Sequence, residues 1–266
     1  MRQLAVALVA LAFLAGPLAA GAQSPGRVYR VGYLGWIASW CADEALKDAL
    51  RELGYVEGKN LAIECRDAGG RYDRLLGAAA DLARLKVDVI VAMSHPSAFA
   101  AKAATATIPI VMLASGEPVA AGFVASLARP GGNMTGLTYY ATELSAKRLE
   151  LLREAAPGVS RVAVMDNPAA AYLDFPFLRD TERAARVLGL QLRIVKVGSP
   201  NDFERVFTSE AKEGVDALYV LPDLMFATQA SQIAQLAIKH RWPTMAWESG
   251  SRTKVGSWPR APTTRP

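Results

Sequence analysis

Small polar side chains stand in short loops directly after apolar runs of this sequence. The clearest group is Ser94, Ser97 and Ser115, whose side chains are small and, for the first two, well suited to capping a helix. At the positive end of a helix, serine hydroxyls and free backbone N–H groups can hold a carboxylate or another anion. These residues therefore predict reversible binding of a small anionic group. The simpler alternative, that the serines only cap the helix that follows, stays open.

Acidic, amide and aromatic side chains in similar loops would complete a binding site. Glu117 and Asp223 are candidates for countering an ammonium group, and Asn167 follows another apolar run in the second half of the chain. Trp36 and Tyr139 offer apolar or stacking surface for the body of a solute. Each has an ordinary alternative role, which is solvation for the carboxylates and packing for the aromatic rings.

The sequence lacks the residue patterns of catalysis and metal binding. Its two histidines, His95 and His240, have no nearby group of cysteines or acidic residues with metal-ligand spacing. The motifs Gly-x-Ser-x-Gly and Gly-x-x-x-x-Gly-Lys-[Ser/Thr] are absent, and no predicted strand is followed by Gly-x-Gly-x-x-Gly. His95 directly follows Ser94, which does not aim its ring at the hydroxyl, and we expect a loop or capping role for it. The sequence predicts a protein that is not an enzyme and uses no cofactor or metal.

The candidate residues are positioned by short apolar runs that alternate with longer helical ones. We predict strands at 28–34, 60–64, 87–92, 108–113, 135–137, 161–165, 190–197, 217–221 and 244–247, and helices at 43–53, 72–85, 97–106, 119–127, 143–155, 175–188, 202–213 and 228–240. Continuously apolar strands joined by helices indicate right-handed βαβ units and parallel sheets. Ligands of such sheets bind outside the carboxyl ends of the strands, where the candidate residues lie.

The repeat of these units predicts an α/β fold with two Rossmann-like lobes, at 23–138 and 139–248. A cleft between the lobes would hold the ligand, with Ser94, Ser97 and Ser115 on one side and Asn167 and Asp223 on the other. One larger doubly wound sheet is the alternative. The segment 249–266 has no periodicity and is rich in Arg, Pro, Ser and Thr, a composition typical of disorder.

The start of the chain has the pattern of a secretory signal peptide. A positive Met1-Arg2 precedes an apolar run from Leu4 to Ala15, and small residues end the segment 1–22. The apolar run is too short to span a bilayer, so we expect a periplasmic protein without membrane insertion after cleavage. A buried N-terminal helix is the alternative.

Charge and cysteine content limit the partners and the redox chemistry. The net charge of +5 on 266 residues is scattered, without a basic stripe interleaved with aromatic residues, so nucleic acid is not an expected partner. Cys41 and Cys65 could form one disulfide in an oxidising compartment, or remain two thiols in separate packing sites.

Four stretches of the sequence resemble the ABC transporter substrate-binding proteins related to tryptophan- and tyrosine-binding receptors. They are Leu50 to Leu61 (LRELGYVEGKNL), Ile108 to Val119 with its IPIV and EPV segments, Ser126 to Leu137 (SLARPGGNMTGL), and Tyr219 to Asp223 (YVLPD). The resemblance covers roughly residues 28–248. It implies a type I periplasmic-binding fold that closes on an amino-acid-like solute or small organic anion, with a permease and an ATPase as partners.

The sequence departs from the family pattern at three places. Glu117 stands where the family usually has Asp, and His95 lies in a loop that usually reads Thr/Ser-Pro. At the other end the family continues with a GGLM-containing strand, a helix and a last crossover, which we expect to be missing here. Codons can be chosen for Ser251 to Pro259 that give Gly-Gly-Leu-Met in another frame, so we expect an aberrant, frameshifted tail from about Ser249.

The resulting hypothesis is a periplasmic solute-binding component of an ABC uptake transporter. Two alternatives remain. The first is a ligand-sensing receptor domain for a signalling partner, and the second is a non-functional truncated gene product.

Overall fold

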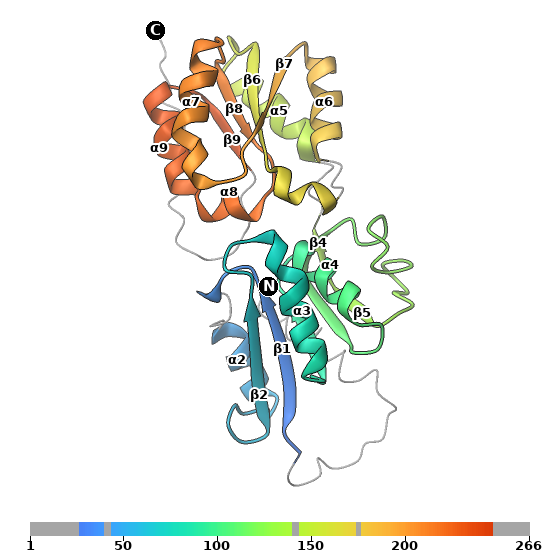
Figure 1. Cartoon of the computed structure of the whole chain (residues 1–266). Helices are drawn as coiled ribbons and strands as arrows, with labels where there is room; N and C mark the ends of the chain where they lie inside the picture. Colours follow the sequence, from blue (N-terminus) through green and yellow to red (C-terminus); the bar gives the residue numbers. More distant parts are fainter. Residues whose placement is uncertain (1–26, 40–43, 140–143, 174–176, 247–266) are drawn as a thin grey trace. The chain divides into compact units, whose positions relative to one another are not determined.

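The computed structural model describes residues 27–39, 44–139, 144–173 and 177–246 (Figure 1). The chain divides into two compact units, with the boundary between residues 139 and 140. Each unit contains one sheet, and all strand pairs of both sheets are parallel. The predicted α/β class with parallel sheets is therefore confirmed. Within the described ranges, no helix has the length and apolar character that a bilayer crossing requires.

The first unit is a five-stranded sheet with the strand order β2-β1-β3-β4-β5. Its elements are β1 (Tyr29–Gly35), α2 (Glu44–Glu52), β2 (Leu61–Asp67), η2 (Tyr72–Arg74), α3 (Leu75–Arg84), β3 (Val89–Ala92), α4 (His95–Ala104), β4 (Ile110–Gly116) and β5 (Met134–Tyr139). Helix α2 covers one face of the sheet, and α3 and α4 pack together on the other (Figure 1). This arrangement follows from right-handed connections between parallel strands.

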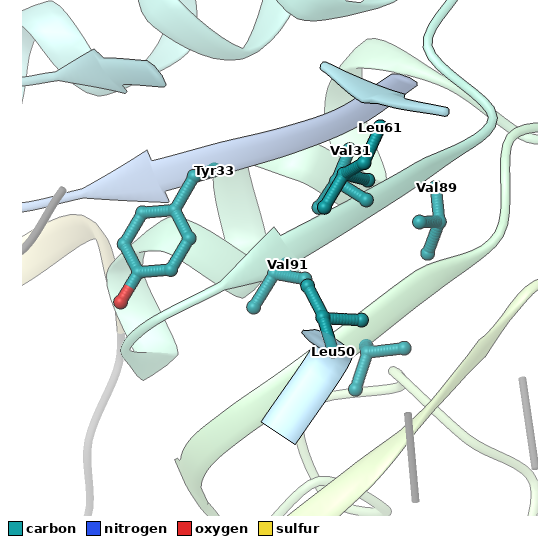
Figure 2. Packing of buried hydrophobic residues seen from close by; sticks show 7 residues of the cluster. Val31, Tyr33, Leu50, Leu61, Val89 and Val91 are labelled. Atoms are coloured by element: carbon teal, nitrogen blue, oxygen red, sulfur yellow. The ribbon is translucent and has the colours of Figure 1, made fainter. Parts of the chain in front are cut away.

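Alternate residues of the central strands form the core beneath α2. Figure 2 shows how Leu50 of α2 meets side chains of the sheet, and the cluster is completed by Val31, Tyr33, Leu61, Val89, Val91 and Val111. Positions two apart in one strand lie on the same face, which explains the pairs Val31 and Tyr33, and Val89 and Val91. Burying one such side chain contributes about 1.5–3 kcal/mol to the free energy of unfolding. This core fixes the strand ends at which the candidate residues lie.

The second unit is a four-stranded sheet with the order β7-β6-β8-β9. Its elements are α5 (Leu144–Ala155), β6 (Arg161–Asp166), η3 (Pro168–Leu173), α6 (Phe177–Leu188), β7 (Gln191–Lys196), η4 (Pro200–Asp202), α7 (Phe203–Lys212), β8 (Ala217–Val220), α8 (Leu224–Thr228), α9 (Ala230–His240) and β9 (Thr244–Ala246). Helices α5 and α6 pack together on one face, and α7 and α9 on the other (Figure 1).

Several predicted helices differ from the structure. The helix predicted at 119–127 is wrong, because the segment forms turns in which Gly122 adopts a positive φ of 68°. The helix predicted at 97–106 begins two residues earlier, at His95. The helix predicted at 228–240 starts instead at Ala230, as α9, and the short helix α8 precedes it because Asp223 caps a new helix start.

Several predictions concern residues outside the described ranges. These are the signal peptide at 1–22, the aberrant tail at 249–266 and the placement of Cys41. Cys65, on the face of β2 that packs against the core beneath α2, is disulfide-bonded. Of the two alternatives for the cysteines, a disulfide therefore holds for Cys65, and a free thiol at this position is excluded.

Candidate functional site

Three loops of the first unit lie side by side at the carboxyl edge of its sheet. They follow β1, β3 and β4, which are adjacent strands in the order β1-β3-β4. A hydrogen bond of 3.1 Å from the Met93 backbone N–H to the Leu34 carbonyl joins the first two strands at this edge. Trp36, Ser94 and Glu117 are therefore brought to one edge of the sheet.

Ser94 and Ser97 form a buried hydroxyl pair at the start of α4. Ser94 is the N-cap, and its Oγ accepts a hydrogen bond of 3.3 Å from the Ser97 backbone N–H. The two Oγ atoms lie 2.9 Å apart, and the Ser97 side chain is 0% exposed. One hydroxyl proton is used within the pair, so the other can be donated to a further acceptor. The helix dipole gives this end of α4 a positive partial charge, which favours an anionic acceptor.

His95 lies between these serines and has a larger structural role than the sequence predicts. Its ring is 3% exposed, and its Nδ1 lies 3.0 Å from the carbonyl oxygen of Gly116 at the end of β4. A carbonyl only accepts, so Nδ1 carries the proton. Burial lowers the pKa of His95 to about 4, against a smaller opposing effect of the hydrogen bond to Gly116, so the ring is neutral at pH 7. A second ring, that of Phe123, packs at a centroid distance of 4.8 Å.

Glu117 follows β4 in a backbone conformation that is unusual for its residue type. Its φ is +48°, in the left-handed region, and its side chain is half-buried. Ser115 and Tyr139 pair along the β4–β5 ladder, with Thr138 and Gly116 respectively. The side chains of Ser115 and Tyr139 lie outside the description, so their proposed contacts with a solute remain predictions.

Trp36 is more buried than a residue that offers open stacking surface. It is 1% exposed, and its ring packs on Tyr72 with the centroids 4.5 Å apart. Tyr72 is the first residue of η2, and Gly70, in the turn between β2 and η2, donates a backbone hydrogen bond of 3.0 Å to the Trp36 carbonyl. The indole N–H of Trp36 is buried and has no hydrogen-bond partner in the described part of the chain. Trp36 therefore packs within its own unit, and its indole N–H is an unused donor as far as the described residues show.

Asn167 and Asp223 form a second buried polar pair, at the carboxyl edge of the second sheet. The Asn167 amide Nδ2 lies 3.3 and 3.2 Å from the two carboxylate oxygens of Asp223, and Asp223 is 8% exposed. Oδ1 of Asp223 also accepts the backbone N–H groups of Met225 and Phe226, which makes Asp223 the N-cap of α8. Both predicted residues of this unit are thus brought together, and an ion pair of Lys196 with Asp166 lies at the same edge.

The two edges provide hydroxyl and backbone donors in the first unit and a hydrogen-bonded carboxylate in the second. Such groups suit the reversible binding of a small polar solute. Among the described residues, no group of three or more His, Cys, Asp or Glu side chains could hold a metal ion. The sequence does not predict the His95–Gly116 contact. The one feature that could indicate it is a histidine in a loop where the family usually has Thr/Ser-Pro.

Solved structures of known proteins have the same architecture. A conserved domain protein from Vibrio cholerae superposes with a TM-score of 0.71 at 28% sequence identity, over 84% of this chain and 75% of the other. An ABC domain in complex with L-Trp from Streptococcus pneumonia gives a TM-score of 0.69 at 21% identity, with the same coverage. The fold is that of the type I periplasmic binding proteins.

Sequence comparison identifies the family. The profile described as ABC transporter substrate binding protein matches residues 40–257, and this chain belongs to that family. A tyrosine-binding protein of Clostridioides difficile is 30% identical over 205 residues, which is 76% of this chain. The match spans 58% of the length of that relative.

Proposed function

We propose that this chain is the solute-binding component of an ABC uptake transporter and that it binds an amino-acid-like solute or a small organic anion. The observation that carries the proposal is the family match over residues 40–257. The tyrosine-binding protein at 30% identity supports an amino acid as the class of solute. A permease and an ATPase would be the partners, and the chain itself would carry out no catalysis.

The solute would be bound by groups from the sheet edges of both units. Its carboxylate would accept a hydrogen bond from the serine hydroxyl that does not donate within the Ser94–Ser97 pair, and it would lie at the positive end of α4. Its ammonium group would be countered by Glu117 or Asp223. Ligand contact with both units stabilises a closed state only if the ligand binds that state more tightly than the open one. The expected signal peptide at 1–22 would place this binding step in the periplasm.

A thermal-melt screen tests the proposal. The chain without residues 1–22 would be heated with each of the common L-amino acids and with aromatic carboxylates, and calorimetry would measure the Kd of every solute that raises the Tm. A solute that binds the native state at 100 times its Kd adds about 2.7 kcal/mol to the free energy of unfolding. If the chain melts cooperatively and no solute in the panel raises its Tm, the result counts against the proposed function.

Two capping serines provide a matched pair of variants. Ser94 caps α4, and Ser199 caps the short helix η4 through a comparable hydrogen bond of 3.3 Å to the Asn201 backbone N–H. We expect Ser94→Ala to weaken solute binding about tenfold, equivalent to about 1.4 kcal/mol, and Ser199→Ala to leave the Kd unchanged. Equal effects of the two substitutions on the Kd would show that the N-terminus of α4 does not bind the solute.

A further inference from the structure

The loop that carries Glu117 is held at two points by one buried side chain. His95 donates from Nδ1 to the Gly116 carbonyl, one residue before Glu117, and its ring packs on Phe123, six residues after Glu117. His95 and Gly116 are 21 residues apart in the sequence, so this contact joins the exits of two neighbouring strands, β3 and β4. The histidine thus connects the start of α4 to both ends of the segment 116–123.

The segment between these two points has little regular structure of its own. Three backbone hydrogen bonds form its turns. They run from the Ala121 N–H to the Glu117 carbonyl at 2.9 Å, from the Gly122 N–H to the Val119 carbonyl at 3.0 Å and from the Phe123 N–H to the Pro118 carbonyl at 2.8 Å. Glu117 has the positive φ that non-glycine residues rarely adopt, and such a conformation persists only where the surroundings determine it. The buried hydrogen bond to Gly116 supplies a constraint directly next to this residue.

We propose that His95 is a positioning residue of the solute site, which holds Glu117 in its left-handed backbone conformation through the hydrogen bond to Gly116. This inference rests on the proposed function, because it assigns Glu117 a contact with the solute. His95 itself does not need to touch the solute. For this role, residue 95 must provide a buried N–H donor at the position of Nδ1 and a side-chain surface that packs on Phe123.

Two substitutions separate the donor from the ring. His95→Phe keeps an aromatic ring against Phe123 and removes the donor, whereas His95→Asn places an amide N–H near the position of Nδ1 and removes the ring. With L-tyrosine as the probe, we expect His95→Phe to raise the Kd about tenfold and His95→Asn to stay within about threefold of the wild-type value. If His95→Phe does not fold, His95→Gln, whose longer amide does not reproduce the Nδ1 position, replaces it.

A double-mutant cycle with Glu117→Gln tests whether His95 acts through Glu117. We expect the double variant His95→Phe/Glu117→Gln to bind L-tyrosine within about threefold of the weaker single variant, because coupled residues are not additive. A role in stability alone would lower the Tm of His95→Phe without changing its Kd. The proposal is overturned if the double variant raises the Kd by the product of the two single effects. It is also overturned if His95→Asn binds L-tyrosine as weakly as His95→Phe does.

Hydrogen exchange of the ligand-free protein distinguishes failure of this inference from failure of the proposed function. We expect the amides of Ala121 and Phe123 to exchange at least about tenfold faster in His95→Phe than in the wild-type protein and in His95→Asn, because local opening exposes these amides. Unchanged exchange in His95→Phe would overturn the positioning role whether or not the protein binds solute. Faster exchange in His95→Phe, together with a wild-type protein that does not bind L-tyrosine, would support the loop contact and count against the solute assignment.

Discussion

Buried polar residues at the sheet edges of this protein are each held by several specific contacts. His95 is enclosed by the start of α4, the end of β4 and the Phe123 ring, and burial lowers its pKa to about 4, so the imidazole is uncharged at neutral pH. Burial disfavours the charged form because the protein interior solvates an imidazolium less well than water does. The cost of charging this ring therefore appears as a dependence of stability on pH.

The pKa of His95 predicts lower stability in mild acid. The folded-state pKa of about 4 lies below the ordinary value of 6.5, so the unfolded chain takes up a proton first as the pH falls. The contribution of His95 to stability is fully present above its ordinary pKa of 6.5 and is lost as the pH falls from 6.5 toward 4, by about 3 kcal/mol in total. Thermal melts between pH 7 and 4.5 should show a steeper decrease of Tm for the wild-type protein than for His95→Phe. Parallel decreases would contradict the assignment.

The Asn167–Asp223 pair predicts a large effect of a single truncation. Asp223→Ala removes the cap of α8 and leaves the buried Asn167 amide without its acceptor, so we expect a loss of about 2–4 kcal/mol. Asp202→Ala is the control, because Asp202 flanks α7 without a side-chain capping bond and its ion pair with Arg205 is on the surface. Urea denaturation measures both variants. A loss for Asp223→Ala no larger than that for Asp202→Ala would show that the pair contributes little to stability.

At the scale of elements, the β4–β5 pairing depends on one glycine. Gly136 adopts a φ of +150°, and a Cβ added there would lie 1.9 Å from the Met112 carbonyl oxygen, so any side chain requires a shift of the backbone. The ladder between the two strands has its register irregularity at Met112 to Ser115, directly beside this contact. The glycine thus allows the two strands to approach closely next to the loop that carries Glu117.

Gly136→Ala should destabilise the first unit by about 3 kcal/mol, at the upper end of the usual cost of overpacking. Gly132→Ala is the control, since a Cβ at Gly132 would meet nothing within 4 Å and its φ is not positive. Chemical denaturation followed by circular dichroism compares the two. Equal stability of both variants would mean that the strands separate at low cost.

The sequence predicts the elements better than it predicts their contacts. Strands such as β3 and β8 are recognised because they are continuously apolar, and the predicted strands each correspond to an observed one with shifted ends. Ser94 and Ser97 are both good capping residues, so the sequence does not determine where α4 starts, and only the structure shows that Ser94 accepts the capping hydrogen bond. The predicted helix at 119–127 failed because its apolar residues lie in turns around Gly122.

The candidate site could be predicted in its residue types and in its location at the strand ends. The two contacts that define the site, His95–Gly116 and Asn167–Asp223, could not be predicted, because they join residues far apart in the chain. The partners are 21 residues apart in the His95–Gly116 bond and 56 apart in the Asn167–Asp223 bond. Local patterns contain no information on which loops become neighbours, since that depends on the strand order of each sheet.

At the scale of the whole molecule, each compact unit is one uninterrupted stretch of chain. Every strand of the first sheet lies before residue 140, and every strand of the second lies after it. No strand pair crosses the boundary among the described residues. Each sheet therefore has all of its described hydrogen-bonding partners within one unit.

This division predicts that the first unit folds without the second. A fragment of residues 23–139 should unfold cooperatively, since it contains the whole five-stranded sheet and the core beneath α2. The shorter fragment 23–116 is the control, because it lacks β5 and leaves β4 as an unpaired edge. Calorimetry distinguishes them. If the longer fragment shows no transition, the first unit requires residues beyond 139.

The same division determines the order of events during synthesis on the ribosome. All strands of the first sheet have been translated before the first strand of the second sheet is made, so the first sheet can assemble while the rest of the chain is still being added. The parallel pairing of β1 with β3 does not have to wait for distant sequence. A nascent chain of this protein would therefore shield its earliest apolar strands from aggregation before translation is complete.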